Sequence, residues 1–189
     1  MRRLAISGVS ILALSFAPRA SAGDLAGVSL PDQVQVGSRT LALNGMGLRE
    51  ATFLKVDVYV AGLYLETKSS DADGILRSEQ AKRLVMKFVR AVGRKDVVKA
   101  WDESFRESAG AALSALKDRV ATFDSYMSDV PSGAVMSFTY LPGSGITVEV
   151  QGVTKGVIAG ADFSRALFSI WLGLSPPNPG LKDGLLGGH

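Results

Sequence analysis

The chain has 189 residues, 47% of them hydrophobic, and its lack of cysteine excludes a disulfide framework, thiol chemistry and a lipoprotein anchor. The formal net charge is +3, but three of the 21 basic residues, Arg2, Arg3 and Arg19, lie within the first 22 residues, where no acidic residue occurs. Residues 23–189 therefore balance 18 basic against 18 acidic residues, which argues against nucleic acid as a main partner.

The first 22 residues have the features of a secretory signal peptide. A positive start at residues 2–3 precedes an apolar run over residues 4–17, and Ala-Ser-Ala at 20–22 is the small-x-small pattern that signal peptidase cleaves. The apolar run is too short for a comfortable membrane span. We expect cleavage before Gly23, export to the periplasm, no transmembrane anchor in the mature chain, and a single domain over residues 23–189.

Strands dominate the first half of the predicted domain. Residues 34–36 and 40–43 flank a Gly-Ser turn and predict a hairpin. Residues 52–66 are rich in β-branched and aromatic residues and predict a longer strand region. A short helix over 71–77 and a strand over 83–92 are expected next.

The second half begins with a helical period from Asp96 onward. Residues recur at helical spacing along two consecutive predicted helices: the mainly apolar stripe Val97, Trp101, Phe105 and Ser108, then the apolar stripe Leu113, Leu116, Val120 and Phe123. Strands over 135–141 and 146–150 bracket Pro-Gly-Ser-Gly, a hairpin turn, and a final helix covers 162–172. Strands grouped on both sides of helices predict an α+β layered architecture with antiparallel strands.

Residues 43–66 show two distinct faces if they are extended. The odd positions include Arg49, Lys55, Asp57 and Tyr59, whereas the even positions include Leu54, Val56, Val58 and Val60. The mixed face is suited to line a ligand cleft or to meet solvent. Ten residues of straight strand span about 33 Å, so Arg49 and Tyr59 can meet only if the chain folds back near residues 50–52 or bends at 61–62.

Several familiar chemistries lack the residues they need. The single histidine is His189, the last residue, so neither a histidine-based triad nor a histidine metal site has a candidate. Gly-Met-Gly at 45–47 lacks the third glycine and the helix of a dinucleotide-binding loop. Glu103 and Glu107 are one helical turn apart, which is typical of a solvated face. No metal and no cofactor are therefore predicted.

Three stretches carry a resemblance to a known family: GMGLRE at 45–50, VDVYVAGLYLE at 56–66 and FSRALFSIWLGLSPPNPGLKDGLLG at 163–187. Over residues 34–186 the chain resembles the chalcone isomerase-like family, in its bacterial exported branch. The resemblance implies a large antiparallel sheet with a layer of helices on one face, an open-faced β-sandwich, and a ligand cleft between the two layers.

The resemblance also implies a set of site residues. Arg49 matches the arginine that holds the phenolate of the substrate in plant chalcone isomerases, and Tyr59 stands where those enzymes have a threonine. In the fatty-acid-binding branch, an arginine and a tyrosine at these positions hold a carboxylate. Trp101 and Ser108 align with a tyrosine and an asparagine of the enzymes, and Ile170 with a threonine. Of the five polar positions, only the arginine is retained.

Three hypotheses follow, and the first is preferred. An exported, non-catalytic protein would bind a fatty acid or similar small apolar acid, with the planar fork of Arg49 and the hydroxyl of Tyr59 on the carboxylate. Trp101, Phe105 and Ile170 would surround the tail. The second hypothesis is an intramolecular lyase or isomerase that acts on a phenolic, chalcone-like or enone substrate. The third is a structural or partner-binding envelope protein on an inactive enzyme fold.

Overall fold

The computed structural model describes residues 21–51 and 56–188 of the chain. Seven strands form one antiparallel sheet in which each strand pairs with the next along the chain. They are β3 (Gln33–Val36), β4 (Arg39–Ala51), β5 (Val56–Leu65), β6 (Lys82–Phe88), β7 (Val135–Leu141), β8 (Gly145–Val150) and β9 (Val153–Ile158). This sheet confirms the predicted antiparallel pairing.

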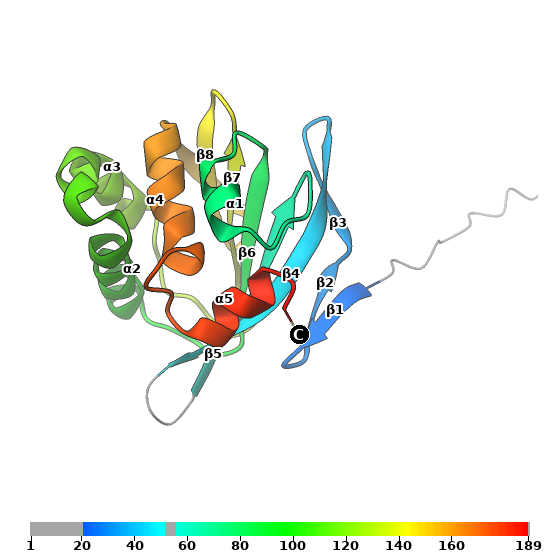
Figure 1. Cartoon of the computed structure of the whole chain (residues 1–189). Coiled ribbons are helices and arrows are strands. Elements are labelled where there is room, and N and C mark those ends of the chain that lie inside the picture. The colour runs from blue at the N-terminus through cyan, green and yellow to red at the C-terminus, as the bar shows by residue number, and fades with distance from the viewer. Residues whose placement is uncertain (1–20, 52–55, 189) are drawn as a thin grey trace, which may run out of the picture.

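The helices gather on one face of the sheet, as Figure 1 shows, and so confirm the α+β class with a single helical layer. They are α1 (Ala72–Arg77), α2 (Arg94–Ala109), the short 3-10 turn η1 (Gly110–Ala112), α3 (Leu113–Ser125), α4 (Ala161–Leu172) and α5 (Pro179–Leu185). The predicted stripe on α2 is correct, because Val97, Trp101 and Phe105 are all buried. Residues at this spacing share one helix face, so α2 lies with that face on the sheet.

Aromatic side chains fill the space between the helices and the sheet. The ring of Trp101 meets those of Phe123, Phe138 and Trp171 edge-on, at centroid distances of 5.1, 5.5 and 5.7 Å. Edge-to-face pairs at such distances stabilise a core beyond the area that they bury. The cluster joins α2, α3, α4 and β7 into one unit and holds α2 and α4 at a fixed distance from the sheet.

A second hairpin, which the sequence pattern did not predict, covers part of the other sheet face. Strands β1 (Ser21–Leu25) and β2 (Val28–Pro31) pair with each other and lie opposite the helices in Figure 1. Leu30 packs there with Val60 and Tyr64, in a smaller apolar cluster. A Cβ atom on Gly62 would stand 2.4 Å from Cδ1 of Leu30, so Gly62 makes room for the hairpin. The bend at residues 61–62, one of the two alternatives for folding this segment back, is absent, since Gly62 pairs regularly with Val85 of β6.

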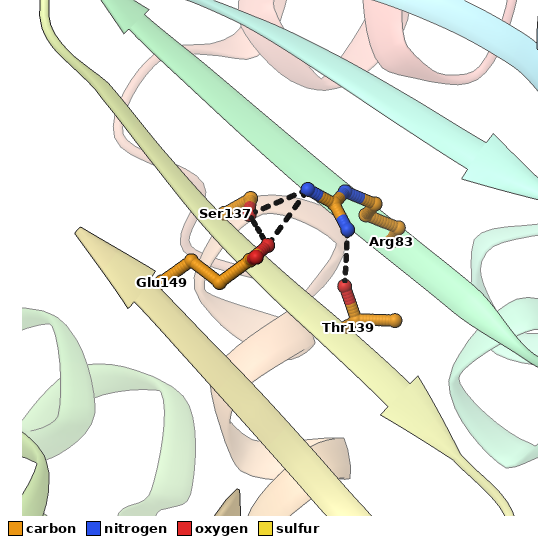
Figure 2. Close-up of polar contacts among 4 residues, drawn as sticks. All are labelled: Arg83, Ser137, Thr139 and Glu149. Carbon is orange, nitrogen blue, oxygen red and sulfur yellow. Dashed lines mark hydrogen bonds and ion pairs between the residues drawn. The ribbon is translucent and has the colours of Figure 1, made fainter. Parts of the chain in front are cut away.

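The rest of this outer face carries a polar network across β6, β7 and β8 (Figure 2). Arg83 donates hydrogen bonds to Thr139 Oγ1 (3.1 Å), Ser137 Oγ (2.9 Å) and Glu149 Oε2 (2.8 Å). The hydroxyl of Ser137 also donates to Glu149 Oε2, at 2.6 Å. These bonds let polar side chains occupy a sheet face without a helical cover, although Nε of Arg83 is buried without a hydrogen-bond partner among the described residues.

Several element bounds differ from the predictions. Strand β6 ends at Phe88 instead of residue 92, because beyond it only Val92 makes an isolated bridge, to Val130. Strand β9 and helix α5 were not predicted. Lys55 and Leu54, assigned to opposite faces of the segment, lie outside the described residues. None of the helices between residues 21 and 188 combines the length and apolar character needed to cross a membrane.

Candidate ligand-binding site

A cavity of about 540 Å³ opens between the inner face of the sheet and helices α2 and α4. Its lining residues on β6 and α4 are buried, whereas Arg90, Gly93 and Asp96, which border it near the start of α2, are exposed. The exposed residues mark the opening, and the buried ones mark the closed end. The volume falls in the range of about 300–1,000 Å³ that is usual for small-molecule sites.

The β4–β5 hairpin brings Arg49 and Tyr59 to the cavity together. The chain reverses between Ala51 and Val56, so that Arg49 and Tyr59 are direct partners in the antiparallel register. Glu50 then pairs with Asp57, which leaves Val58 as an extra residue on β5, a β-bulge. Arg49, Val58 and Tyr59 all line the cavity. The reversal expected near residues 50–52 thus places both predicted polar residues at one site.

Arg49 is half-buried, and its hydrogen-bond partners in the described part of the chain are backbone carbonyls. Its Nη1 donates to the carbonyl oxygens of Glu50 and, at 3.1 Å, of Pro177. No carboxylate forms an ion pair with Arg49 among the described residues. A guanidinium has five N–H donors and a permanent positive charge. The two carbonyls therefore hold its direction while its charge stays available to an anion in the cavity.

Tyr59 is buried, with 8% of its surface exposed, and it remains a neutral hydroxyl. Its oxygen accepts a hydrogen bond from Nε1 of Trp171 at 3.0 Å, and its ring packs against Phe88 at 5.6 Å. Burial raises the pKa of Tyr59 to about 12, although the Trp171 bond and the positive charge of Arg49 both act to lower it. At physiological pH the hydroxyl keeps its proton and is able to donate a hydrogen bond.

The closed end of the cavity is apolar and aromatic. Met86 and Phe88 line it from β6, Trp101 from α2, and Ile170 and Trp171 from α4. All five side chains are buried. Such a wall favours a hydrocarbon or aromatic group, because each buried methylene of a ligand contributes about 0.8 kcal/mol.

Two residues of the predicted site lie outside the cavity lining. Phe105 is fully buried one turn beyond Trp101, in ring contact with Phe123 and Phe163. Ser108 donates from Oγ to the carbonyl oxygen of Ala166 at 3.1 Å and so joins α2 to α4. Of the six predicted residues, the cavity brings together Arg49, Tyr59, Trp101 and Ile170. The spacing of α2 placed Phe105 and Ser108 on the correct face, but the helix continues past the end of the cavity.

The predicted site did not include Trp171, Ser104, Arg90 or the β6 residues of the lining. Trp171 directly follows Ile170, yet only the fold shows that its indole reaches Tyr59. Ser104 lies one helical turn after Trp101, and residues at this spacing lie on the same face of α2. Arg90 had no signal in the sequence, because it belongs to the connection between β6 and α2.

The fold and the site define an open-faced antiparallel sheet whose helical layer encloses a cavity lined by Arg49 and Tyr59, with an aromatic interior. A family model described as chalcone isomerase-like matches residues 22–187, and the chain belongs to this family. The predicted resemblance is thereby confirmed at the level of the family and of the fold.

A solved structure of the same fold comes from a plant. The crystal structure of a fatty-acid binding protein from Arabidopsis thaliana superposes with a TM-score of 0.68 and 18% sequence identity, and the match covers 85% of this chain and 92% of that one. At this identity the likeness shows the shared fold. A search of curated protein sequences finds no match.

Proposed function

We propose that this protein binds a fatty acid or a similar small apolar acid in the cavity between sheet and helices, without transforming it. The observation that carries the proposal is the pairing at one cavity of Arg49, a guanidinium that forms no ion pair with an acid among the described residues, with a buried neutral hydroxyl, Tyr59. The ligand carboxylate would accept from both, and its tail would lie among Trp101, Ile170 and Met86. The Arabidopsis neighbour, named as a fatty-acid binding protein, supports the same ligand class.

The chemistry of the cavity favours binding over catalysis. General acid–base catalysis works best with a group whose pKa lies near the operating pH. Tyr59, the buried titratable residue of the lining, has a pKa raised to about 12 and therefore holds its proton.

The second candidate, an intramolecular lyase or isomerase acting on a chalcone-like or enone substrate, is favoured by the retained Arg49. Turnover of a chalcone-like compound by the purified protein would support it, and no turnover across a broad panel would exclude that substrate class.

The third candidate, a structural or partner-binding envelope protein on an inactive enzyme fold, would be favoured by a cleft filled by side chains. The cavity of about 540 Å³ argues against it.

The proposal also includes export, with residues 1–22 as a cleaved signal peptide and the periplasm as the destination. Fractionation of host cells tests this part: the chain lacking residues 1–22 should stay in the cytoplasm, and the full chain should appear, shortened, in the periplasmic fraction.

Titration of delipidated protein with decanoate tests the ligand proposal. Arg49→Ala should weaken decanoate binding at least about tenfold, because a hydrogen bond to a charged group contributes about 1.5–3 kcal/mol. Arg49→Lys should lie between Arg49→Ala and wild type, since it keeps the charge but loses the fork. Arg77→Ala is the matched control, because Arg77 is a solvent-exposed arginine of α1 outside the cavity lining.

Circular dichroism and thermal unfolding must show that each variant is folded. Equal decanoate affinity in wild type and Arg49→Ala would refute the role of Arg49. A wild-type protein that does not bind decanoate, decanol or longer acids would refute the binding function itself.

A further inference from the structure

The hydrogen bond between Trp171 and Tyr59 has a fixed polarity. An indole N–H donates and never accepts, so the 3.0 Å contact requires the tyrosine oxygen to be the acceptor. The proton of the Tyr59 hydroxyl must then point elsewhere. Trp171 is 1% exposed and Tyr59 8% exposed, so solvent is largely excluded from this pair.

A second polar residue beside Tyr59 is also a pure donor. Arg49 is its direct partner in the strand register, and a guanidinium has no acceptor. No hydrogen bond from the Tyr59 hydroxyl to a protein acceptor occurs among the described residues. Tyr59 lines the cavity, so its donor is free for a molecule placed there.

We propose that Trp171 is a positioning residue that sets the direction of the Tyr59 hydroxyl and thereby makes the cavity selective for ligands whose head group only accepts hydrogen bonds. A carboxylate fulfils this requirement, whereas an alcohol or amine also brings a hydrogen-bond donor next to the donors of Arg49 and Tyr59. This inference rests on the proposed function and adds to it the residue that determines head-group specificity.

The indole is itself held in place by packing. Its ring meets that of Trp101 edge-on, with 5.7 Å between the ring centroids, and packs against the tilted ring of Phe138 at a centroid distance of 6.0 Å. The indole thus has little freedom to turn its N–H away from Tyr59. A phenylalanine in its place would keep an aromatic ring in this cluster but would leave the tyrosine hydroxyl free to rotate and to act as either donor or acceptor.

The test compares an acid with the matching alcohol. Dissociation constants for decanoate and 1-decanol are measured by calorimetry with wild type, Trp171→Phe and Tyr59→Phe, and selectivity is the ratio of the decanol constant to the decanoate constant. Trp171→Phe should lower this ratio about fivefold or more, chiefly through weaker decanoate binding, since a directed donor to an anion is lost. The double variant should match Tyr59→Phe alone, because Trp171 acts through Tyr59.

Trp101→Phe is the matched control. Trp101 lines the same cavity and is equally embedded in the aromatic cluster, but it does not bond to Tyr59. It should change the affinities for both ligands by the same factor and leave selectivity unaltered. Indole N–H signals in ¹⁵N spectra provide a second readout, because the chain has two tryptophans. Tyr59→Phe should shift the Trp171 signal far more than that of Trp101.

The outcomes separate the two proposals. If wild type binds decanoate and Trp171→Phe weakens both ligands equally, Trp171 only packs, and the positioning role is overturned while the binding function stands. If the ratio falls with Trp171→Phe and not with Trp101→Phe, the positioning role is established. If wild type binds neither ligand, the proposed function fails, and the specificity built on it fails with it.

Discussion

The docking of α5 on β4 leaves no space at Gly47, and this contact permits a sharp test of how the fold supports the site. A Cβ atom on Gly47 would stand 2.3 Å from the carbonyl oxygen of Leu181 and 2.9 Å from its carbonyl carbon. Gly184 fits the same contact from the other side, where a Cβ atom would stand 2.2 Å from the carbonyl oxygen of Met46. Both obstacles are backbone atoms, which cannot move aside as a flexible side chain would.

The magnitude of the Gly47→Ala effect follows from these distances. Ordinary contact begins at 3.4 Å, so α5 must retreat from β4 by roughly 1 Å at Leu181. Overpacking of this kind costs about 1–3 kcal/mol in unfolding free energy. If α5 leaves its place altogether, Leu181 and Leu185, both 0% exposed, also lose their burial, at about 1.5–3 kcal/mol each.

The same displacement should reach the ligand site. Nδ2 of Asn178, just before α5, donates to the carbonyl oxygen of Leu48 at 3.1 Å, and the carbonyl of Pro177 holds Arg49. A shift of α5 therefore loosens the guanidinium. Gly47→Ala should weaken decanoate binding as well as lower the free energy of unfolding.

Urea denaturation followed by tryptophan fluorescence measures the stability change. Gly180→Ala is the control within the same helix, because a Cβ atom at the exposed Gly180 meets nothing within 4 Å. It should be neutral or stabilise by up to about 1 kcal/mol through helix propensity. If Gly47→Ala unfolds at the same urea concentration as wild type, the close approach of α5 and β4 is not what these glycines provide.

Two further predictions concern charged side chains in the sheet. Lys82 is 2% exposed, and burial lowers its pKa to about 8, so between pH 8 and 10.5 the unfolded chain binds a proton that the folded chain has lost. The unfolding free energy of wild type minus that of Lys82→Met should therefore rise with pH, by up to about 3 kcal/mol between pH 7 and 10.5; a flat difference would contradict a buried, destabilised cation. Glu149→Ala should lower stability by about 1–3 kcal/mol because it leaves the half-buried Arg83 without its counter-charge. Glu103→Ala, at an exposed ion pair, is the control and should cost no more than about 0.5 kcal/mol of unfolding free energy. If chemical denaturation gives the same loss for Glu149→Ala and Glu103→Ala, the network in Figure 2 adds no stability.

The family fingerprints in the sequence owe their pattern to one tertiary contact. GMGLRE lies on β4 and GLKDGLLG, residues 180–187, overlaps α5, and their glycines fit closely where the two elements touch. Both stretches are recognisable in the sequence, but their contact is not. Neither α5 nor the hydrogen bond from Arg49 to the carbonyl of Pro177 was therefore predicted.

The missed hairpin β1–β2 has a similar cause. Its strands have only five and four residues, too few for a periodic pattern to be recognised in the sequence. What stabilises them is the surface of β4 and β5, where Leu30 finds Val60 and the space above Gly62. A short strand of this kind is defined by the face that it covers, and this face is formed by residues much further along the chain.

The sequence by itself determined what depends on near neighbours. The Pro-Gly-Ser-Gly turn between β7 and β8 predicted that antiparallel pair, and the spacing of Val97, Trp101 and Phe105 predicted the buried face of α2. Periodicity records which side of an element is buried, and this is a local property.

Only the tertiary structure decided which side chains meet at the site. Arg49 faces Tyr59 because of the hairpin register and the bulge at Val58, and neither is encoded by alternation alone. Trp171 reaches Tyr59 from 112 residues away, because the aromatic core holds α4 above β5. A donor cluster of this kind depends on the distance and angle between layers, and these are set by the packing of the whole core rather than by any segment of it.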